Sequence, residues 1–137
     1  MESIIFIDMM HAVYLTRCLV NLLLERPKKS AIIYTNSKLG MIPAPGSIVY
    51  SSTKAFLINF AQGLNYEVKN KIDVMTYNCG DTTTKLMTIE KHGFGIVSPQ
   101  RASKACFRDL GSNSVTYGVA SHEIKARMLL WLPLSFA

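Results

Sequence analysis

The 137-residue sequence contains no G-x-G-x-x-G run, the glycine-rich turn with which many dinucleotide-binding folds hold a pyrophosphate. The segment Gly93-Phe94-Gly95 has only two glycines and is too short to form such a turn. Cysteine is also scarce. Because Cys18, Cys79 and Cys106 are far apart and odd in number, they favour reduced thiols in a reducing compartment over a disulfide framework. The three histidines are isolated from one another, so the sequence offers no metal-ligand spacing.

Charge is sparse as well: 18% of the residues are charged, 49% are hydrophobic, and the net charge is +6. This balance indicates a globular chain and excludes an intrinsically disordered one. Lysine and arginine are scattered except at Arg26-Pro-Lys28-Lys29, which we interpret as a solvated turn rather than a phosphate or lipid-headgroup site. No aromatic residues surround that cluster, so we expect no nucleic-acid partner.

Uninterrupted apolar runs of membrane-spanning length are missing too. Residues 4–24 are rich in Ile, Leu, Val and Met but contain Asp8, His11 and Arg17, which make a spanning helix costly. We therefore expect a helix buried against a sheet or a sister subunit. The apolar residues 128–137 are too few to span a bilayer and include a proline, so an interfacial anchor and a simple apolar tail both stay open.

Hydrophobic periodicity and turn residues predict an α/β fold, with strands alternating with helices in a parallel sheet. No internal repeat or low-complexity linker occurs, so we expect residues 1–137 to form one structural unit. The expected elements are helix 8–25, strand 30–36, a Pro/Gly loop 38–47, helix 48–69, strand 72–78, a mobile segment 82–97, helix 98–110, strand 114–119 and helix 121–131.

Tyr50 and Lys54 carry the clearest chemical signal. Residues four apart on a helix lie on the same face, so both side chains can point at one substrate atom. An ammonium beside a phenol stabilises the phenolate and lowers a phenol's pKa from about 10, as a general acid near neutral pH requires. Ser37, at the end of the preceding strand, can hydrogen-bond a carbonyl or alkoxide oxygen as charge develops on it. The three residues together suit interconversion of a ketone and an alcohol.

A second Tyr-x-x-x-Lys match, Tyr34 to Lys38, begins in a run that reads as a strand. Strand positions four apart are separated by roughly 13 Å, so this pair cannot share a proton. We therefore assign the site to Tyr50 and Lys54.

The segment that contains these residues resembles the catalytic segment of short-chain dehydrogenases/reductases, most closely the branch of very-long-chain 3-oxoacyl-CoA reductases and 17-beta-hydroxysteroid dehydrogenases. The resemblance rests first on Ala31-Ile-Ile-Tyr-Thr-Asn-Ser37-Lys-Leu-Gly40, Pro43, Pro45 and Tyr50-Ser-Ser-Thr-Lys54-Ala-Phe. Further matches follow in the same order: Asp73-Val74, Thr84-Lys85-Leu86, Ser98-Pro99, Thr116-Tyr-Gly118 and His122.

With no glycine-rich turn, the chain looks like the C-terminal half of such a reductase. The resemblance implies the second half of a Rossmann-like, doubly wound parallel sheet whose first βαβ half is missing. It assigns proton donation to Tyr50, cofactor-ribose binding and activation of the phenol to Lys54, and carbonyl orientation to Ser37. Gly80 and Thr84 correspond to nicotinamide contacts. In place of the family's Pro-Gly pair, Gly80 follows a cysteine here.

The family's fourth catalytic residue, an asparagine, aligns with Asp8 when one residue is inserted near Lys28 and Lys29. A carboxylate at this position is expected to stabilise the Lys54 ammonium but to disturb the water-mediated proton relay that the family uses.

The resemblance implies NADPH as the cofactor and a small-molecule lipid or steroid ketone as the substrate. It also implies homo-oligomers and association with the endoplasmic reticulum membrane; without it, the composition suggests a cytoplasmic location. We expect the chain alone to be inactive, since nothing anchors the pyrophosphate, and its strand Ala31–Asn36 to be an exposed apolar edge. The alternative is a non-catalytic interaction module, or pseudoenzyme, that dimerises through its first two long helices.

Overall fold

A computed structural model of the chain describes residues 2–84, 93 and 95–131. Its strands form a parallel sheet in the order β1-β2-β3. In chain order the elements are α1 (Glu2–Ile5), the π-helical η1 (Phe6–Met10), α2 (His11–Leu24), β1 (Ser30–Ser37), the 3-10 helix η2 (Lys38–Met41), α3 (Ile48–Val68), β2 (Ile72–Cys79), α4 (Pro99–Asp109), β3 (Val115–Thr116) and α5 (Ala120–Trp131).

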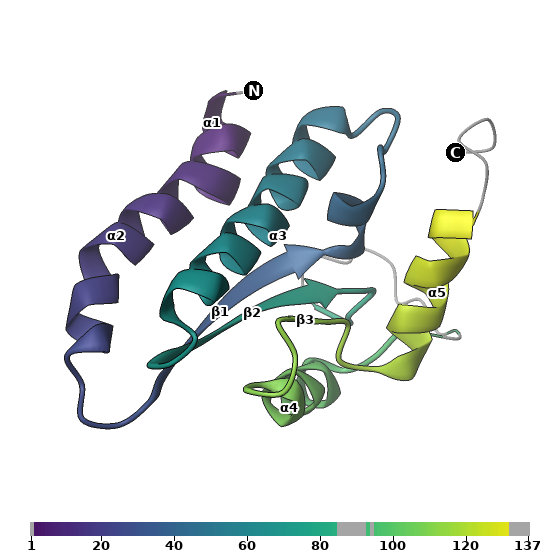
Figure 1. Cartoon of the computed structure of the whole chain (residues 1–137). Helices are drawn as coiled ribbons and strands as arrows, with labels where there is room; N and C mark the ends of the chain where they lie inside the picture. Colours follow the sequence, from purple (N-terminus) through teal and green to yellow (C-terminus); the bar gives the residue numbers. More distant parts are fainter. Residues whose placement is uncertain (1, 85–92, 94, 132–137) are drawn as a thin grey trace.

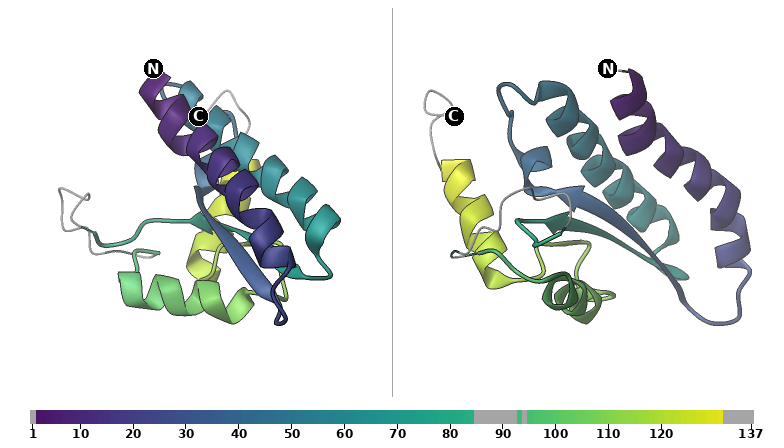
Figure 2. Two further views of the ribbon diagram at one scale, coloured as in Figure 1. Left: turned by 90° about the vertical axis from the view of Figure 1, so that its left-hand side faces the viewer. Right: turned by 180° about the vertical axis from the view of Figure 1, so that it is seen from behind.

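The helices cover both faces of this sheet. The continuous helix α1–η1–α2 and helix α3 lie side by side over one face, while α4 lies on the other (Figure 1). The views in Figure 2 show the same two layers from the side and from behind. The α/β class and the parallel sheet predicted from the sequence are confirmed.

Most of the predicted elements lie within two residues of the observed ones. The first helix begins earlier, at Glu2 rather than residue 8, and Asp8 lies inside the π-helical turn that continues it. The last strand is shorter than predicted, since Gly118 has a φ of 73°, outside the range of strand backbone. Most of the predicted mobile segment 82–97 and the end of the C-terminal apolar segment lie outside the described residues.

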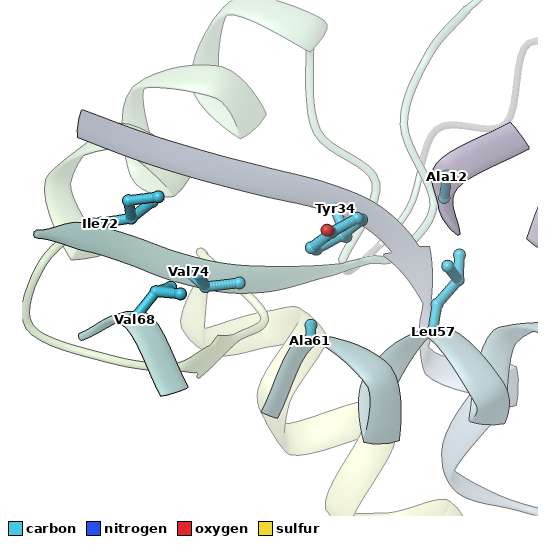
Figure 3. Close-up of a cluster of buried hydrophobic side chains, with 7 residues drawn as sticks. All are labelled: Ala12, Tyr34, Leu57, Ala61, Val68, Ile72 and Val74. Carbon is cyan, nitrogen blue, oxygen red and sulfur yellow. The ribbon is translucent and has the colours of Figure 1, made fainter. Parts of the chain in front are cut away.

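The core on the α3 face is built mainly from aliphatic side chains around one tyrosine. Leu57 and Ala61 of α3 pack against Tyr34 of β1 (Figure 3). The remaining buried members of this cluster come from α2, the end of α3 and β2: Ala12, Val68, Ile72 and Val74. The ring of Tyr34 also meets Phe60 edge to face, 5.9 Å between centroids, and its hydroxyl is hydrogen-bonded to Thr16. Tyr34 is therefore a core residue of a strand, as its sequence context predicted.

The first helix is less buried than we predicted. Only Ala12 and Thr16 of α2 are buried, because one face of the helix packs on α3 and β1 while the other is open. Several large apolar side chains on the open face are exposed: Ile4, Ile5, Phe6, Ile7, Tyr14, Leu15, Leu19 and Leu22. By length and mean hydropathy, the 23-residue helix Glu2–Leu24 is the one described helix that could cross a membrane, a test that core helices and signal sequences also pass.

Three partly or fully buried tyrosine side chains are expected to make the protein less stable at alkaline pH. Burial raises the pKa of Tyr34, Tyr77 and Tyr117 above the usual value. Above pH 10 the unfolded chain releases these protons more readily than the folded chain, so the free energy of unfolding is expected to hold up to about pH 9 and fall beyond about pH 10. Denaturant midpoints followed by circular dichroism from pH 8 to 11.5 measure this loss. Tyr77→Phe should reduce the slope, whereas Tyr66→Phe, at an exposed position, should leave it unchanged.

Candidate functional site

The carboxyl ends of β1 and β2 meet at the same edge of the sheet. Ser37 is the register partner of Cys79, so the residues that follow each strand lie next to one another. A pocket of about 440 Å³ opens at this edge. Its walls come from β1, η2, the first turn of α3 and the turn after β2: Asn36, Ser37, Lys38, Leu39, Tyr50, Cys79, Gly80, Asp81, Thr82 and Thr84.

Tyr50 and Lys54 lie in the first two turns of α3, as their spacing predicted. Tyr50 is half-buried and lines the pocket, whereas Lys54 is buried behind it. The Lys54 ammonium nitrogen lies 5.3 Å from the centroid of the Tyr50 ring. Its nearest charged partner is Asp8, whose Oδ1 is 3.1 Å from Nζ. The structure thus brings the predicted tyrosine and lysine together and adds a carboxylate from η1.

Ser37 ends β1 and begins η2. Its Oγ accepts a hydrogen bond from the backbone N–H of Leu39 at 3.2 Å, which fixes the hydroxyl group at the pocket wall. Because that bond uses a lone pair, the O–H hydrogen is free to donate to a substrate oxygen in the pocket. Ser37 and Tyr50 therefore line the same pocket from neighbouring elements.

Gly80 begins the turn after β2 and rests against the ring of His122. The backbone N–H of Gly80 donates to Nδ1 of His122 at 3.2 Å. The other ring nitrogen, Nε2, lies 2.9 Å from the carbonyl oxygen of Gly95. A ring that accepts at Nδ1 and faces a carbonyl at Nε2 is a neutral imidazole with its proton on Nε2. With 1% of its surface exposed, His122 is a core residue that holds the pocket turn.

Asp81 ties the same turn to two other elements. Its Oδ2 lies 3.5 Å from Nζ of Lys38 in η2 and 3.3 Å from Nζ of Lys125 in α5. Partial burial acts to raise the pKa of Asp81, but the two ammonium groups outweigh it and hold the pKa below the usual value. Asp81 is thus paired with two lysines, and sequence spacing carried no signal for partners so distant along the chain.

Thr84 lies at the exposed rim of the pocket, beyond Thr82. The hydroxyl of Thr82 bonds to the carbonyl oxygen of Gly80 at 3.2 Å. Thr82 also forms an isolated parallel bridge with Val97. These contacts hold the turn between Gly80 and Val97 in place.

Gly80→Ala is expected to lower the free energy of unfolding by about 1–3 kcal/mol, because a Cβ there would lie 2.5–2.8 Å from three atoms of the His122 ring. The ring is buried and hydrogen-bonded on both sides, so it has little room to move. Denaturant unfolding measures the loss. Gly63→Ala, in the exposed middle of α3 with no atom within 4 Å of the new Cβ, is the matched control and should stabilise by about 0.5–1 kcal/mol. Equal effects of the two substitutions would contradict this account.

A family model and similar curated proteins point to the same family. The family model described as short chain dehydrogenase matches residues 1–93. The chain is 34% identical over 124 residues to very-long-chain 3-oxoacyl-CoA reductase-B of Danio rerio, covering 90% of this chain and 40% of that protein. It is 32% identical over 135 residues to very-long-chain 3-oxoacyl-CoA reductase of Anas platyrhynchos, covering 98% of this chain and 43% of that protein. The chain thus spans about two-fifths of the length of these relatives.

Solved structures show the same fold. A short chain dehydrogenase from Burkholderia cenocepacia in complex with NADP superposes with a TM-score of 0.75 at 18% identity, over 91% of this chain and 54% of that chain. The bulky-bulky ketone specific alcohol dehydrogenase from Comamonas testosteroni gives a TM-score of 0.69 at 20% identity, over 97% of this chain and 55% of that chain. The sheet and helices described above therefore correspond to about half of each of these chains.

Proposed function

Because the chain belongs to the short-chain dehydrogenase family, we propose that it carries the substrate-side half of an NADPH-dependent ketone reductase acting on long-chain 3-oxoacyl thioesters. One observation carries the proposal: Ser37, Tyr50, Gly80 and Thr84 line a single pocket, with the Lys54 ammonium directly behind the tyrosine ring. This is the donor set that reduction of a carbonyl group needs.

In this proposal each side chain has a defined task. Ser37 donates its hydroxyl hydrogen to the substrate carbonyl and orients it. Tyr50 gives its phenolic proton to the oxygen as negative charge develops there, and it acts as the base in the reverse direction. Lys54 stabilises the resulting phenolate by its positive charge. The bound nicotinamide supplies the hydride.

The pocket fits the nicotinamide end of the cofactor. Its volume of about 440 Å³ suits a ring and a ribose, and it is lined by hydroxyl groups at Tyr50, Thr82 and Thr84 that can bond ribose hydroxyls or a carboxamide. Tyr50, Lys54, Gly80 and Thr84 would hold this end. The sequence contains no glycine-rich turn for the pyrophosphate, so that contact must come from residues outside this chain. We propose NADPH rather than NADH because the resembling branch works reductively.

The names of the relatives support the substrate class, since several are very-long-chain 3-oxoacyl-CoA reductases at about 30% identity. Steroid ketones are the second substrate class that we propose to test. The exposed apolar face of Glu2–Leu24 supports two further proposals: attachment to the endoplasmic reticulum membrane surface and pairing with a second copy of the protein.

A chimaera tests the proposed function. The N-terminal portion of the Danio rerio relative is joined ahead of this chain to provide the glycine-rich turn that the family resemblance implies. We expect ketone-dependent oxidation of NADPH, measured by absorbance at 340 nm, with long-chain 3-oxoacyl-CoA as the best substrate and NADH as a poorer cofactor. A folded chimaera that binds NADPH but reduces neither 3-oxoacyl thioesters nor steroid ketones would contradict the proposal, and tighter binding of NADH would overturn the cofactor preference.

The alternative function is a non-catalytic interaction module that dimerises through α1–η1–α2 and α3. The row of exposed large apolar residues on the first helix favours it, because such a surface is typical of a protein interface. An active chimaera would exclude this alternative as the sole function. An inactive chimaera that still forms a dimer would support it.

A further inference from the structure

Asn36 is a buried polar residue that joins the strand of Ser37 to the helix of Tyr50. It directly precedes Ser37 in β1, and 4% of its surface is exposed. β1 runs under α3 (Figure 1), and the Nδ2 group of Asn36 donates a hydrogen bond to the Lys54 carbonyl oxygen at 3.0 Å. Among the described residues, this is the one hydrogen bond between β1 and α3. A single amide therefore connects the two elements that carry the proposed hydroxyl donors.

The same peptide of α3 packs tightly against the turn that follows Ser37. Gly40 of η2 lies so close that an added Cβ would be 2.8 Å from the Lys54 carbonyl carbon and 3.0 Å from the Ala55 nitrogen. This packing limits how closely the helix approaches η2, but van der Waals contact has no preferred direction. A hydrogen bond is directional, so the Asn36 amide fixes where the peptide lies along the strand.

Stability alone does not account for an amide at this position. The Oδ1 atom of Asn36 is buried and has no hydrogen-bond partner among the described residues. A buried acceptor without a partner lowers stability, and an apolar side chain avoids that cost. The Lys54 carbonyl also keeps its place in the helical hydrogen-bond pattern of α3 without Asn36. The bond to α3 is thus the one polar contact of this side chain within the described residues.

We propose that Asn36 is a positioning residue of the reductase site: by holding the Lys54 peptide, it sets the spacing between the Ser37 and Tyr50 hydroxyl groups. Both hydroxyls must lie within about 2.6–3.2 Å of the same substrate oxygen. They line one pocket from different elements, so a shift of α3 along β1 changes the distance between them. The consequence for turnover rests on the proposed function, whereas the contact between β1 and α3 does not.

The test compares Asn36→Leu with the unsubstituted chimaera. Leucine has the same branched shape but cannot donate a hydrogen bond, and it removes the unpartnered acceptor, so the melting temperature should stay within about 3 °C. The turnover number should fall by roughly 10- to 100-fold, because a misplacement of about 1 Å weakens the contacts to the reacting oxygen. The KM for the ketone and the dissociation constant of NADPH should stay within about threefold, because these contacts strengthen as charge develops in the transition state.

Asn78→Leu is the matched control. Asn78 is the register partner of Asn36 on β2, is fully buried, and makes no hydrogen bond to α3 among the described residues. The same substitution at this neighbouring position should leave turnover within about twofold of the unsubstituted chimaera. Equal losses from the two variants, or an unchanged turnover number in folded Asn36→Leu, would overturn the proposal.

Two further measurements do not need turnover. In crystal structures of the chimaera, Asn36→Leu should change the distance between Ser37 Oγ and Tyr50 Oη by about 0.5–1 Å. Should this variant fail to fold, hydrogen exchange of the side-chain amides in the unsubstituted, ¹⁵N-labelled chimaera decides. The Asn36 amide should exchange at least about 100-fold more slowly than that of the exposed Asn70, and exchange at equal rates would overturn the proposal.

These measurements also separate the role of Asn36 from the proposed function. A changed distance between the two hydroxyls in Asn36→Leu, made in a chimaera that reduces no ketone, would refute the proposed function alone. An active chimaera in which Asn36→Leu leaves that distance unchanged would refute the role of Asn36 alone.

Discussion

Tyr50→Phe is expected to lower the turnover number of the chimaera by roughly 100- to 10,000-fold, the usual contribution of general acid catalysis. The substitution removes the phenolic proton that the substrate oxygen needs and keeps the ring that lines the pocket. Lys54→Ala should lower both turnover and NADPH affinity, because the ammonium lies 5.3 Å from the centroid of the same ring and its positive charge stabilises a phenolate. Initial rates of NADPH oxidation at saturating ketone, with nucleotide binding measured separately, distinguish the two effects.

Tyr34→Phe is the matched control for this result. It removes the same hydroxyl from the other Tyr-x-x-x-Lys match, whose tyrosine packs in the core beside Thr16 and Phe60. Loss of the Thr16 hydrogen bond should lower the free energy of unfolding by about 1 kcal/mol, while turnover should stay within about twofold of the wild type. Comparable losses of turnover from Tyr34→Phe and Tyr50→Phe would refute the assignment of the site.

Local features of the sequence were enough to predict the two strands that position Ser37 and Gly80 and the helix that carries Tyr50 and Lys54. Apolar runs bounded by turn residues mark the strands, and a long periodic stretch after a Pro/Gly loop marks the helix. Spacing also separated Tyr50 from Tyr34, because positions four apart are neighbours on a helix but are separated by roughly 13 Å along a strand. These predictions depend on neighbours in the chain, which is why they succeeded.

The contacts that shape the pocket turn depend on residues far apart in sequence, and no local pattern encodes them. The pairing of Asp81 with Lys38 and Lys125 joins the exits of β1 and β2 to α5. His122 reaches Gly80 only because α5 folds back onto the end of β2. An isolated histidine or aspartate in the sequence gives no sign of such partners; a resemblance can suggest the position, as it did for Asp8, but not the contact.

The apolar edge predicted from the sequence has a structural basis in β1. Within residues 2–84, 93 and 95–131, β1 pairs with β2 alone, so its other edge has no strand partner there. A groove of about 300 Å³ runs between that edge and α2, lined largely by apolar side chains. Leu15 and Leu19 are exposed beside it. An open edge flanked by apolar residues favours pairing with other chains.

The 137-residue chain alone is therefore expected to associate or precipitate, and to bind NADPH with a dissociation constant no better than about 1 mM, equivalent to about −4 kcal/mol. Its pocket offers contacts to the nicotinamide end through Tyr50, Lys54 and Thr84, but the sequence has no glycine-rich turn to bind the pyrophosphate. Size-exclusion chromatography and fluorescence titration with NADPH measure both properties. The chimaera is the control and should bind NADPH at least 100-fold more tightly, because it regains the pyrophosphate contacts. A soluble monomer of the chain alone that binds NADPH at micromolar concentration would show that the pocket at the ends of β1 and β2 is sufficient to hold the cofactor.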